Sequence, residues 1–277
     1  MRRTGRLWQI AAWLGALAFL AVVVFPFYWM LNTSLKPASE VFSSPPTFIS
    51  ANWTIEPYLH MWSARPFDRY FLNSAVVSVG STTLAVALSA LAAYGFSRFN
   101  LRWEQPLIVL LLFTQMLPGT LLIIPYFQVM SKIGLINNYL SLILAYVSFA
   151  LPFSTWMLIG FFRSIPLDLD EAAMVDGCGR IGAFWRVVLP LSLPGLVAVA
   201  IFTFLLAWNA YVWALVLTTD PKMFPISVGI PNMMGEYQIL WNELMAAAVL
   251  ATLPVLVLYG FLERYLVQGM TSGAVKG

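Results

Sequence analysis

Hydrophobic residues in this chain form long runs, and polar and charged residues collect in the segments between those runs. A run of about 20 apolar residues is long enough to cross a bilayer as a helix. The pattern predicts about six membrane-spanning helices, over residues 7–31, 70–97, 106–130, 139–163, 195–217 and 245–262. We therefore expect an all-α membrane protein in which residues 1–277 form a single transmembrane domain.

The composition agrees with this prediction. Hydrophobic residues make up 60% of the 277-residue chain and charged residues only 10%, whereas a soluble domain carries roughly 25% charged residues. The first apolar run is longer than the core of a cleaved signal peptide, which is about 7–15 residues. We expect it to be retained as the first span of a multi-pass protein in the lipid bilayer.

The basic residues are distributed unevenly between the two sides of the predicted spans. If the N-terminus lies inside, ten of the 15 Lys and Arg residues fall in inner segments and five in outer ones. Segments that face the cytoplasm carry an excess of Lys and Arg. This bias predicts that both termini are cytoplasmic and that residues 164–193, the most charged connection, also face the cytoplasm.

The predicted spans have no Asp, Glu, Lys, Arg or His in their apolar cores. Ion-coupled carriers usually place such groups at membrane depth, and a membrane enzyme needs paired carboxylates, a supported nucleophile or metal ligands. The single histidine, His60, and the single cysteine, Cys178, do not make a metal site, which normally needs about three or four protein ligands. We therefore expect the energy for any transport to come from a partner.

The charged segment, residues 164–193, predicts two short helices separated by a glycine turn. Pro166 is suited to the first helical position, and Asp168 and Asp170 would lie near the positive end of the helix dipole. Gly177 is suited to left-handed backbone geometry that ends the helix. We expect the second helix to begin near Gly179 and to end before Pro190.

The second predicted helix is amphipathic. Ile181, Phe184, Trp185 and Val188 follow the i, i+3, i+4, i+7 spacing of one apolar stripe. Such a helix could lie among lipid headgroups or dock onto another protein. The spacing alone leaves both interpretations open.

A family resemblance favours docking. Glu171-Ala172-Ala173, Asp176-Gly177, Phe184 and Leu189-Pro190 resemble the EAA motif of binding-protein-dependent ABC importer permeases. Further motifs resemble the carbohydrate-importer branch, and in particular the maltose-type inner-membrane permease, over essentially the whole chain: 33–37 (TSLKP), 73–74 (NS), 93–95 (AYG), 134–137 (GLIN), 152–153 (PF), 208–209 (WN) and 273–277 (GAVKG). The chain departs from the family pattern at Cys178 and Gly179, where Ala and then Ser or Thr are usual.

The resemblance implies a type I ABC importer permease fold and a location in a bacterial or archaeal cytoplasmic membrane. It implies four kinds of partner: a homologous permease subunit, two ATPase subunits, an extracytoplasmic solute-binding protein and the lipid bilayer, with no nucleic acid. ATP and Mg would bind to the ATPase, and this chain would bind no cofactor. The residues implied to couple the chain to the ATPase are Glu171, Ala172, Ala173, Asp176, Gly177, Phe184, Pro190 and Lys276.

The substrate path is less sharply defined by the sequence. Sugars bind through aromatic faces and a few placed polar groups, which makes Gln115, Trp208, Asn209 and Tyr211 candidates, with helix packing as an equally good explanation. Pro118 and Gly119 would interrupt the third span, either as a plain kink or as a kink that lines a pathway. The spans carry no cation, which favours a neutral sugar over the anionic alternative, glycerol 3-phosphate; a polyol carried by the same class of importer is a further alternative. An ion-coupled carrier or a membrane enzyme is a more distant alternative.

Overall fold

The computed structural model describes residues 3–99, 101–235 and 239–274, with side chains for 8–99, 101–235 and 239–263. Within these residues the chain consists of helices and connecting turns, with no β-strand. The all-α prediction is confirmed. Contacts divide the chain into two compact units, Met1–Phe67 with Ile230–Leu253, and Asp68–Gly229 with Pro254–Gly277.

The first unit contains a long N-terminal helix and several short elements. They are α1 (Arg3–Ser34), α2 (Ala38–Val41), α3 (Glu56–Ala64), η5 (Pro231–Met233) and the first part of α14 (Trp241–Ala274). Polar side chains connect these elements: the Asn242 amide donates to the Lys36 carbonyl at 3.1 Å. The Arg65 guanidinium donates to the Asn232 and Met233 carbonyls, both at 3.2 Å.

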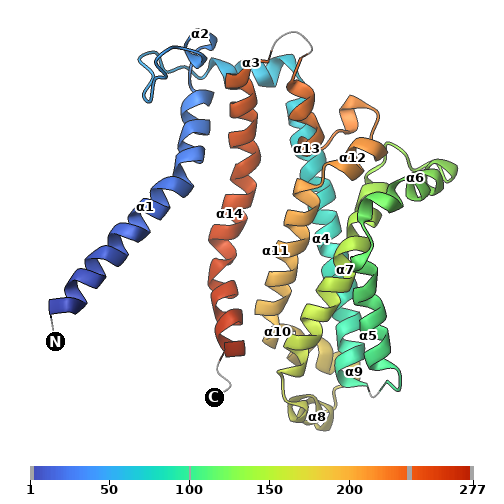
Figure 1. Ribbon diagram of the computed structural model, residues 1–277. Coiled ribbons are helices and arrows are strands. Elements are labelled where there is room, and N and C mark those ends of the chain that lie inside the picture. The colour runs from blue at the N-terminus through green and yellow to red at the C-terminus, as the bar shows by residue number, and fades with distance from the viewer. Residues whose placement is uncertain (1–2, 100, 236–238, 275–277) are drawn as a thin grey trace. The chain divides into compact units, whose positions relative to one another are not determined.

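The second unit is a bundle of long helices with shorter helices at its ends. Its elements are α4 (Phe67–Arg98), α5 (Glu104–Phe113), η1 (Thr114–Met116), η2 (Gly119–Leu122), α6 (Ile123–Lys132), α7 (Tyr139–Arg163), α8 (Leu167–Val175), α9 (Arg180–Ala183), η3 (Phe184–Val188), α10 (Leu189–Leu191), α11 (Leu193–Asn209), α12 (Val212–Leu217), η4 (Pro221–Met223), α13 (Ile226–Gly229) and the later part of α14, from Pro254. In Figure 1, α7 lies beside α11 and α5. The core of this unit is built around α7.

Four described helices are long and apolar enough to cross a membrane: Trp8–Ser34, Phe67–Arg98, Tyr139–Arg163 and Trp241–Glu263. Two further pairs of helices meet the same test together but are sharply bent, which brings the number to as many as six. The number agrees with the prediction of about six spans. The chain is therefore a multi-pass membrane protein.

The third predicted span is two arms rather than one kinked helix. Glu104–Met116 and Gly119–Lys132 meet at 86°. Leu117 is extended, with ψ of 127°, because the ring of Pro118 disfavours helical geometry in the residue before it. Pro118 is also non-helical, with ψ of 118°, so the helix cannot continue through this pair.

The fifth predicted span is also interrupted. Helix α11 ends at Asn209, and α12 begins at Val212. Ala210 between them is extended, with φ of −67° and ψ of 113°, and its carbonyl accepts a hydrogen bond from Ser227 Oγ at 2.7 Å. The run of apolar residues alone did not indicate this break.

Polar side chains hold the turns beside these breaks. Asn137 has a positive φ of 58°, and its Oδ1 accepts from the backbone N–H groups of Thr219 at 2.7 Å and Asp220 at 3.0 Å. The Asn73 amide donates to the carbonyls of Lys222 and Phe224 at 2.8 and 2.9 Å. Both asparagines belong to motifs that carried the family resemblance, and both have a structural task.

Candidate functional site

The first helix of the charged segment is α8, and it presents most of its surface to solvent. It begins at Leu167, one residue after the predicted start, with Pro166 as the preceding cap residue. Val175 is 86% exposed, and Glu171, Ala172 and Asp176 are also exposed. Asp170 is the buried residue of this helix. An exposed helix with apolar and acidic side chains is available for contact with a partner.

Gly177 ends α8 as predicted. Its φ is +87°, which is left-handed geometry that a side chain disfavours. The Gly177 N–H donates to the Met174 carbonyl at 3.1 Å, and the Cys178 N–H donates to the Ala173 carbonyl at 3.0 Å. These two bonds form a Schellman motif. A Cβ at Gly177 would meet no atom within 4 Å, so the requirement for glycine comes from backbone conformation and not from crowding.

The sequence predicted that the second helix of the charged segment ends before Pro190. In the structure it continues past this residue, so the prediction was wrong. Helical structure continues from α9 through η3 and α10 to Leu191. The η3 turn is π-helical, and the Leu189 N–H donates to the Phe184 carbonyl five residues earlier. Proline has no N–H to continue the ladder of hydrogen bonds, and a π-turn directly before Pro190 keeps the chain helical.

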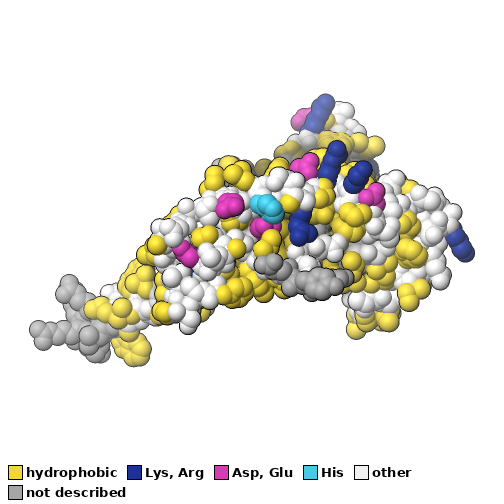
Figure 2. Space-filling view, turned by 90° about the horizontal axis from the view of Figure 1, so that it is seen from above, with side chains coloured by type: hydrophobic (Ala, Val, Ile, Leu, Met, Phe, Trp, Pro, Cys, Tyr) yellow, Lys and Arg dark blue, Asp and Glu magenta, His cyan; other side chains and the backbone are white. Residues whose placement is uncertain are grey.

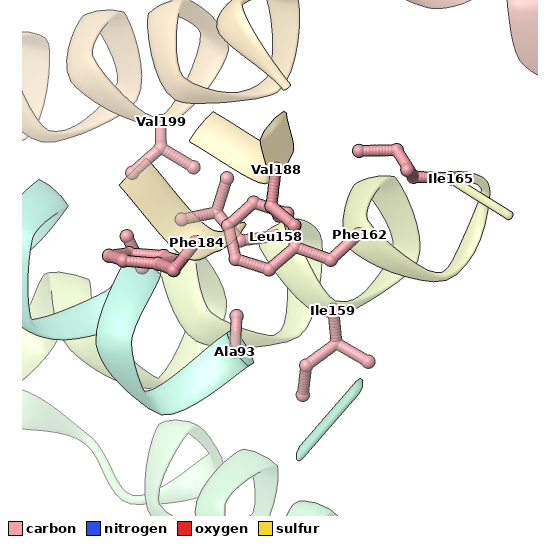
Figure 3. Packing of buried hydrophobic residues seen from close by; sticks show 9 residues of the cluster. Ala93, Leu158, Ile159, Phe162, Ile165, Phe184, Val188 and Val199 are labelled. Atoms are coloured by element: carbon pink, nitrogen blue, oxygen red, sulfur yellow. The ribbon is translucent and has the colours of Figure 1, made fainter. Parts of the chain in front are cut away.

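The predicted apolar stripe divides into two rows. Phe184 and Val188 are buried at 3% and 0% exposure, whereas Ile181 and Trp185 are 76% and 63% exposed. The inner row packs with residues of α4, α7 and α11, as Figure 3 shows for Leu158, Phe162 and Val199. The outer row remains uncovered in this chain.

The Phe184 side chain anchors the charged segment. Its ring lies 4.8 Å from the Tyr94 ring and 6.5 Å from the Phe162 ring, measured between centroids. The sequence placed Phe184 among the coupling residues, and the structure places its side chain in the core between α4 and α7. Any effect of this residue on a partner must therefore pass through the position of the segment.

A buried ion pair that the sequence reasoning missed holds α8 in place. Arg98 at the end of α4 donates to the Asp170 carboxylate, and the two side chains are 5% and 8% exposed. The Arg98 guanidinium also donates to the Phe162 carbonyl at 2.9 Å and to the Ile165 carbonyl at 3.3 Å. Asp170 Oδ1 has no hydrogen-bond partner among the described residues. Arg98 therefore joins α4, the end of α7 and α8.

The remaining coupling candidates are distributed over the surface of the segment. Pro190 is exposed and Ala173 is half-buried. Lys276 lies outside the described residues. Cys178 is half-buried, and Arg186 Nη1 lies 3.6 Å from its Sγ. Gly179 caps α9 without a side-chain hydrogen bond, as expected for glycine at that position.

The structure separates the four substrate-path candidates. Gln115 lines a cavity of about 350 Å³, and its amide donates to the Phe149 carbonyl at 3.0 Å. Trp208 is 4% exposed and packs against the rings of Phe71 and Phe204. Asn209 donates to a carbonyl of its own helix at 2.9 Å. Neither Asn209, Tyr211 nor Trp208 lines the cavity that contains Gln115.

This helix-break cavity lies where two helices are interrupted. Its lining includes residues from η1 and η2, from α7, and from the break between α11 and α12: Gln115, Gly119, Tyr146, Phe149, Ala210 and Trp213. Non-helical backbone within a membrane protein occurs where protein or a water-filled cavity surrounds it. Tyr146 and Trp213 were not among the candidates, because only the fold brings them next to Gln115.

The first unit has one acidic–histidine pair at its surface. His60 Nδ1 lies 2.7 Å from Glu243 Oε1, and the histidine, cyan in Figure 2, is visible beside acidic side chains. The described residues contain no group of three or more His, Cys, Asp or Glu side chains that could hold a metal ion. We assign this pair a structural role.

Comparison with known proteins identifies the family. Residues 85–272 match the model of the binding-protein-dependent transport system inner membrane component. The match covers more than half of the chain and includes the whole charged segment. The chain belongs to this family. It is therefore a permease subunit of an ABC transporter and not an enzyme.

Two relatives and one solved structure are similar to the chain over most of its length. It is 37% identical to the sulfoquinovosyl glycerol transport system permease protein SmoH of Agrobacterium fabrum, over 92% of this chain and 89% of that protein. It is 34% identical to the trehalose/maltose transport system permease protein MalG of Thermococcus litoralis, over 95% of both chains. A crystal structure of a bacterial ABC transporter involved in alginate import has a chain with a TM-score of 0.85 and 20% identity, over 96% of this chain and 99% of that chain. The last likeness confirms the ABC importer permease fold.

Proposed function

We propose that this chain is the permease subunit of an ATP-driven importer that moves a sugar or oligosaccharide across the cytoplasmic membrane. The observation that carries the proposal is similarity over nearly the whole chain to permeases named for sulfoquinovosyl glycerol and for trehalose and maltose. A shared fold alone would not indicate a substrate. Similarity at 34–37% identity over more than 90% of the chain supports a related one.

The charged segment is the contact to the ATPase in this proposal. Two copies of the ATPase bind ATP and Mg, and this chain binds no cofactor itself. The exposed residues of α8 and the outer row of Ile181 and Trp185 offer the surface on which one ATPase subunit docks. A homologous permease subunit carries the equivalent segment for the other ATPase.

The buried contacts of the charged segment explain how docking could move the spans. Arg98 pairs with Asp170 and binds the end of α7, and Phe184 packs against rings of α4 and α7. A force applied to α8 therefore acts on two long helices at once. ATP-driven closure of the ATPases would move these helices between inward-facing and outward-facing arrangements.

The orientation is also part of the proposal. The distribution of Lys and Arg favours cytoplasmic termini and a cytoplasmic charged segment, in a bacterial or archaeal cytoplasmic membrane. Residues 220–242 would then lie outside and contact the solute-binding protein. Cys178, the only cysteine of the chain, allows a direct test with a membrane-impermeant maleimide.

In that test, we expect labelling of Cys178 in inside-out vesicles and protection in right-side-out spheroplasts. Labelling after detergent solubilisation in both preparations controls for accessibility of the half-buried thiol. Labelling from the outside only would overturn the orientation.

The transport activity is tested with the complete assembly in proteoliposomes. We expect uptake of radiolabelled trehalose, maltose or sulfoquinovosyl glycerol to require the binding protein, the ATPase subunits and ATP together. Glycerol 3-phosphate serves as the probe for the phosphate alternative. Uptake that proceeds without the ATPase, or that is specific for glycerol 3-phosphate, would overturn the proposed function.

A further inference from the structure

Residues 218–229, which include η4 and α13, form a loop with an exposed tip and a buried return; we call it the clamped loop. Residues 219–222 at the tip are exposed, whereas Ile226 and Val228 are 2% and 1% exposed. Figure 1 places α12 and α13 at one end of α4 and α7, and α8 at the other end. The clamped loop and the charged segment therefore lie at opposite ends of the same two helices.

The start of the clamped loop is bonded to the start of α7. Asn137 Oδ1 accepts from the backbone N–H groups of Thr219 and Asp220 at 2.7 and 3.0 Å, and the Asn137 amide donates to Thr219 Oγ1 at 2.9 Å. The Asn137 backbone N–H donates to the Leu217 carbonyl at 3.0 Å. Asn138, the next residue, caps α7. These bonds fix the loop to the end of that helix.

The middle of the clamped loop is bonded to α4 by a buried asparagine. Asn73 is 1% exposed, and its amide donates to the carbonyls of Lys222 and Phe224 at 2.8 and 2.9 Å. Asn73 Oδ1 accepts from the hydroxyl of Tyr139, the first residue of α7, at 2.7 Å. The amide nitrogen and the amide oxygen of Asn73 are both used, and this one side chain joins the loop, α4 and α7.

The return of the clamped loop lies directly on α4. Ser74 Oγ accepts from the Ile226 N–H at 2.7 Å, and the rings of Tyr70 and Phe224 lie 6.3 Å apart between centroids. A Cβ at Gly229 would lie 2.2 Å from the Tyr70 ring, so only glycine permits this close approach. A bonded and packed network of this kind holds one geometry. The loop and the two helix ends therefore move together.

The same two helices hold the charged segment at their other ends. Arg98, the last residue of α4, bonds to Asp170 of α8 and to the Phe162 carbonyl near the end of α7. Asn73 and Arg98 lie roughly 37 Å apart along α4 at the rise of an α-helix. Rigid helices that are bonded at both ends can carry energetic coupling over such a distance.

We propose that Asn73 and Asn137 are positioning residues that clamp residues 218–229 to α4 and α7, so that a solute-binding protein docked on the exposed tip acts on the charged segment through these two helices. The proposal rests on the proposed function, in which residues 220–242 contact the solute-binding protein, and it assigns the residues that connect this contact to the ATPase. Without the clamp, docking on the tip would move the loop alone.

The test is the factor by which a nonhydrolysable ATP analogue with Mg changes the affinity of the complete assembly for the binding protein. The binding protein is loaded in turn with trehalose, maltose and sulfoquinovosyl glycerol. Coupling between two ligands is reciprocal and typically amounts to about 5- to 150-fold. Asn73→Ala and Asn137→Gly remove the clamping side chains and should reduce the factor by about 2- to 30-fold. Glycine is chosen at position 137 because it accepts the φ of 58° without strain.

This factor separates a positioning role from general damage. A loop that is only destabilised binds the binding protein more weakly with and without nucleotide, and the factor keeps its wild-type value. Asn137→Asp retains the oxygen that accepts from two backbone N–H groups and tolerates the same φ, so it should recover most of the factor lost in Asn137→Gly. Tyr139→Phe removes one bond of the clamp and should give a smaller reduction than Asn73→Ala.

Asn32→Ala is the matched control. Asn32 is 2% exposed, and its amide donates to the Thr47 carbonyl at 3.3 Å, which joins the end of α1 to the segment before α3 within the first unit. It should leave the factor unchanged. A wild-type factor in both Asn73→Ala and Asn137→Gly would overturn the clamp, and so would an equal reduction in Asn32→Ala.

Stimulation of ATP hydrolysis by the binding protein gives a second readout. Asn73→Ala and Asn137→Gly should lose most of this stimulation, while hydrolysis without the binding protein stays close to wild type. Co-purification of all subunits checks assembly, and if Asn73→Ala does not assemble, Asn137→Gly and Tyr139→Phe carry the same test. Full stimulation in the assembled variants would contradict the clamp alone. If the wild-type assembly imports none of the probes, the proposed function fails and the clamp fails with it.

Discussion

The charged segment and the helix-break cavity differ in how side-chain hydrogen bonds join the helices around them. At the charged segment, Arg98 of α4 bonds to the Asp170 carboxylate and to two backbone carbonyls, and the end of α8 is closed by two backbone bonds. At the cavity, the hydroxyl of Tyr146 has no partner among the described residues. Asp170 Oδ1 is unpaired as well, so the difference lies in the side-chain bonds that cross between helices: Arg98 makes three at the charged segment, and Gln115 makes one, to the Phe149 carbonyl, at the cavity.

The bonds at the charged segment match the task that we assign to it. A segment that transmits force must keep its position relative to α4 and α7, so its bonds are internal. The following changes test this contrast, from the largest expected effect to the smallest.

Replacing Arg98 with Ala should give the largest effect. Removing one partner of a buried ion pair leaves an uncompensated charge and costs about 3–5 kcal/mol. We expect a strong loss of unfolding free energy in detergent and loss of ATP-coupled uptake. Arg163→Ala is the matched control, because the Arg163–Glu104 pair has side chains 47% and 23% exposed and such pairs contribute up to about 1 kcal/mol. Equal losses in the two variants would contradict the anchoring role of Arg98.

Replacing Gly177 with Val should uncouple ATP hydrolysis from uptake. A side chain in left-handed geometry costs about 1–3 kcal/mol, which the end of α8 can relieve only by changing its turn. We expect the subunit to insert normally and uptake to fall about tenfold while ATPase activity continues, and Gly177→Asn to be tolerated better.

Gly134→Val provides the control for strain alone. Gly134 has a φ of +71° and an equally open surrounding, but it lies in the turn between α6 and α7. If Gly134→Val uncouples the importer as strongly as Gly177→Val, strain at any turn is sufficient and the special role of the charged segment is lost.

Replacing Val175 with Asp should weaken binding of the ATPase subunit. Val175 is 86% exposed on α8, and a charge in an apolar contact costs about 1–2 kcal/mol, a roughly 5- to 30-fold loss of affinity. Co-purification and titration of the ATPase with the permease pair measure the change. Phe42→Asp, at a residue 76% exposed in the first unit, should have no such effect. Unchanged affinity in Val175→Asp would indicate that α8 docks through another face.

Glu40 should show the smallest effect, because it is only half-buried and its partners are neutral side chains. Hydrogen bonds from Ser50 and Asn52 lower the pKa of its carboxyl below the ordinary value of 4.5. Because folding lowers this pKa, the stabilisation is present at neutral pH and is lost as the pH falls below the ordinary value and through the lowered pKa. Unfolding of wild type and Glu40→Gln between pH 3 and 7 should show a slightly flatter pH dependence in the variant. A steeper dependence in the variant would contradict the assignment.

Much of the architecture was predictable from the sequence because lipid imposes a simple rule on it. Backbone groups in the bilayer must be bonded internally, so long apolar runs become helices, and Tyr139–Arg163 has the predicted bounds. Gly177 was predicted from local backbone geometry and confirmed by its φ of +87°.

Other features depend on residues that are far apart in the chain. Arg98 and Asp170 are 72 positions apart, and no local pattern indicates that they pair. The choice of Phe184 and Val188 over Ile181 and Trp185 for burial depends on where α4, α7 and α11 lie. In the same way, Gln115 meets Tyr146 and Trp213 only because two helices break beside α7.

The sequence by itself therefore determined the membrane class, the approximate number of spans, the turn at Gly177 and the family of the charged segment. These depend on local hydrophobicity, backbone conformation and motif order. Only the tertiary structure decided which face of η3 is buried, which arginine anchors α8 and which polar groups surround the helix-break cavity. Those properties arise from contacts between distant segments, and packing chooses among several local arrangements that the sequence permits equally.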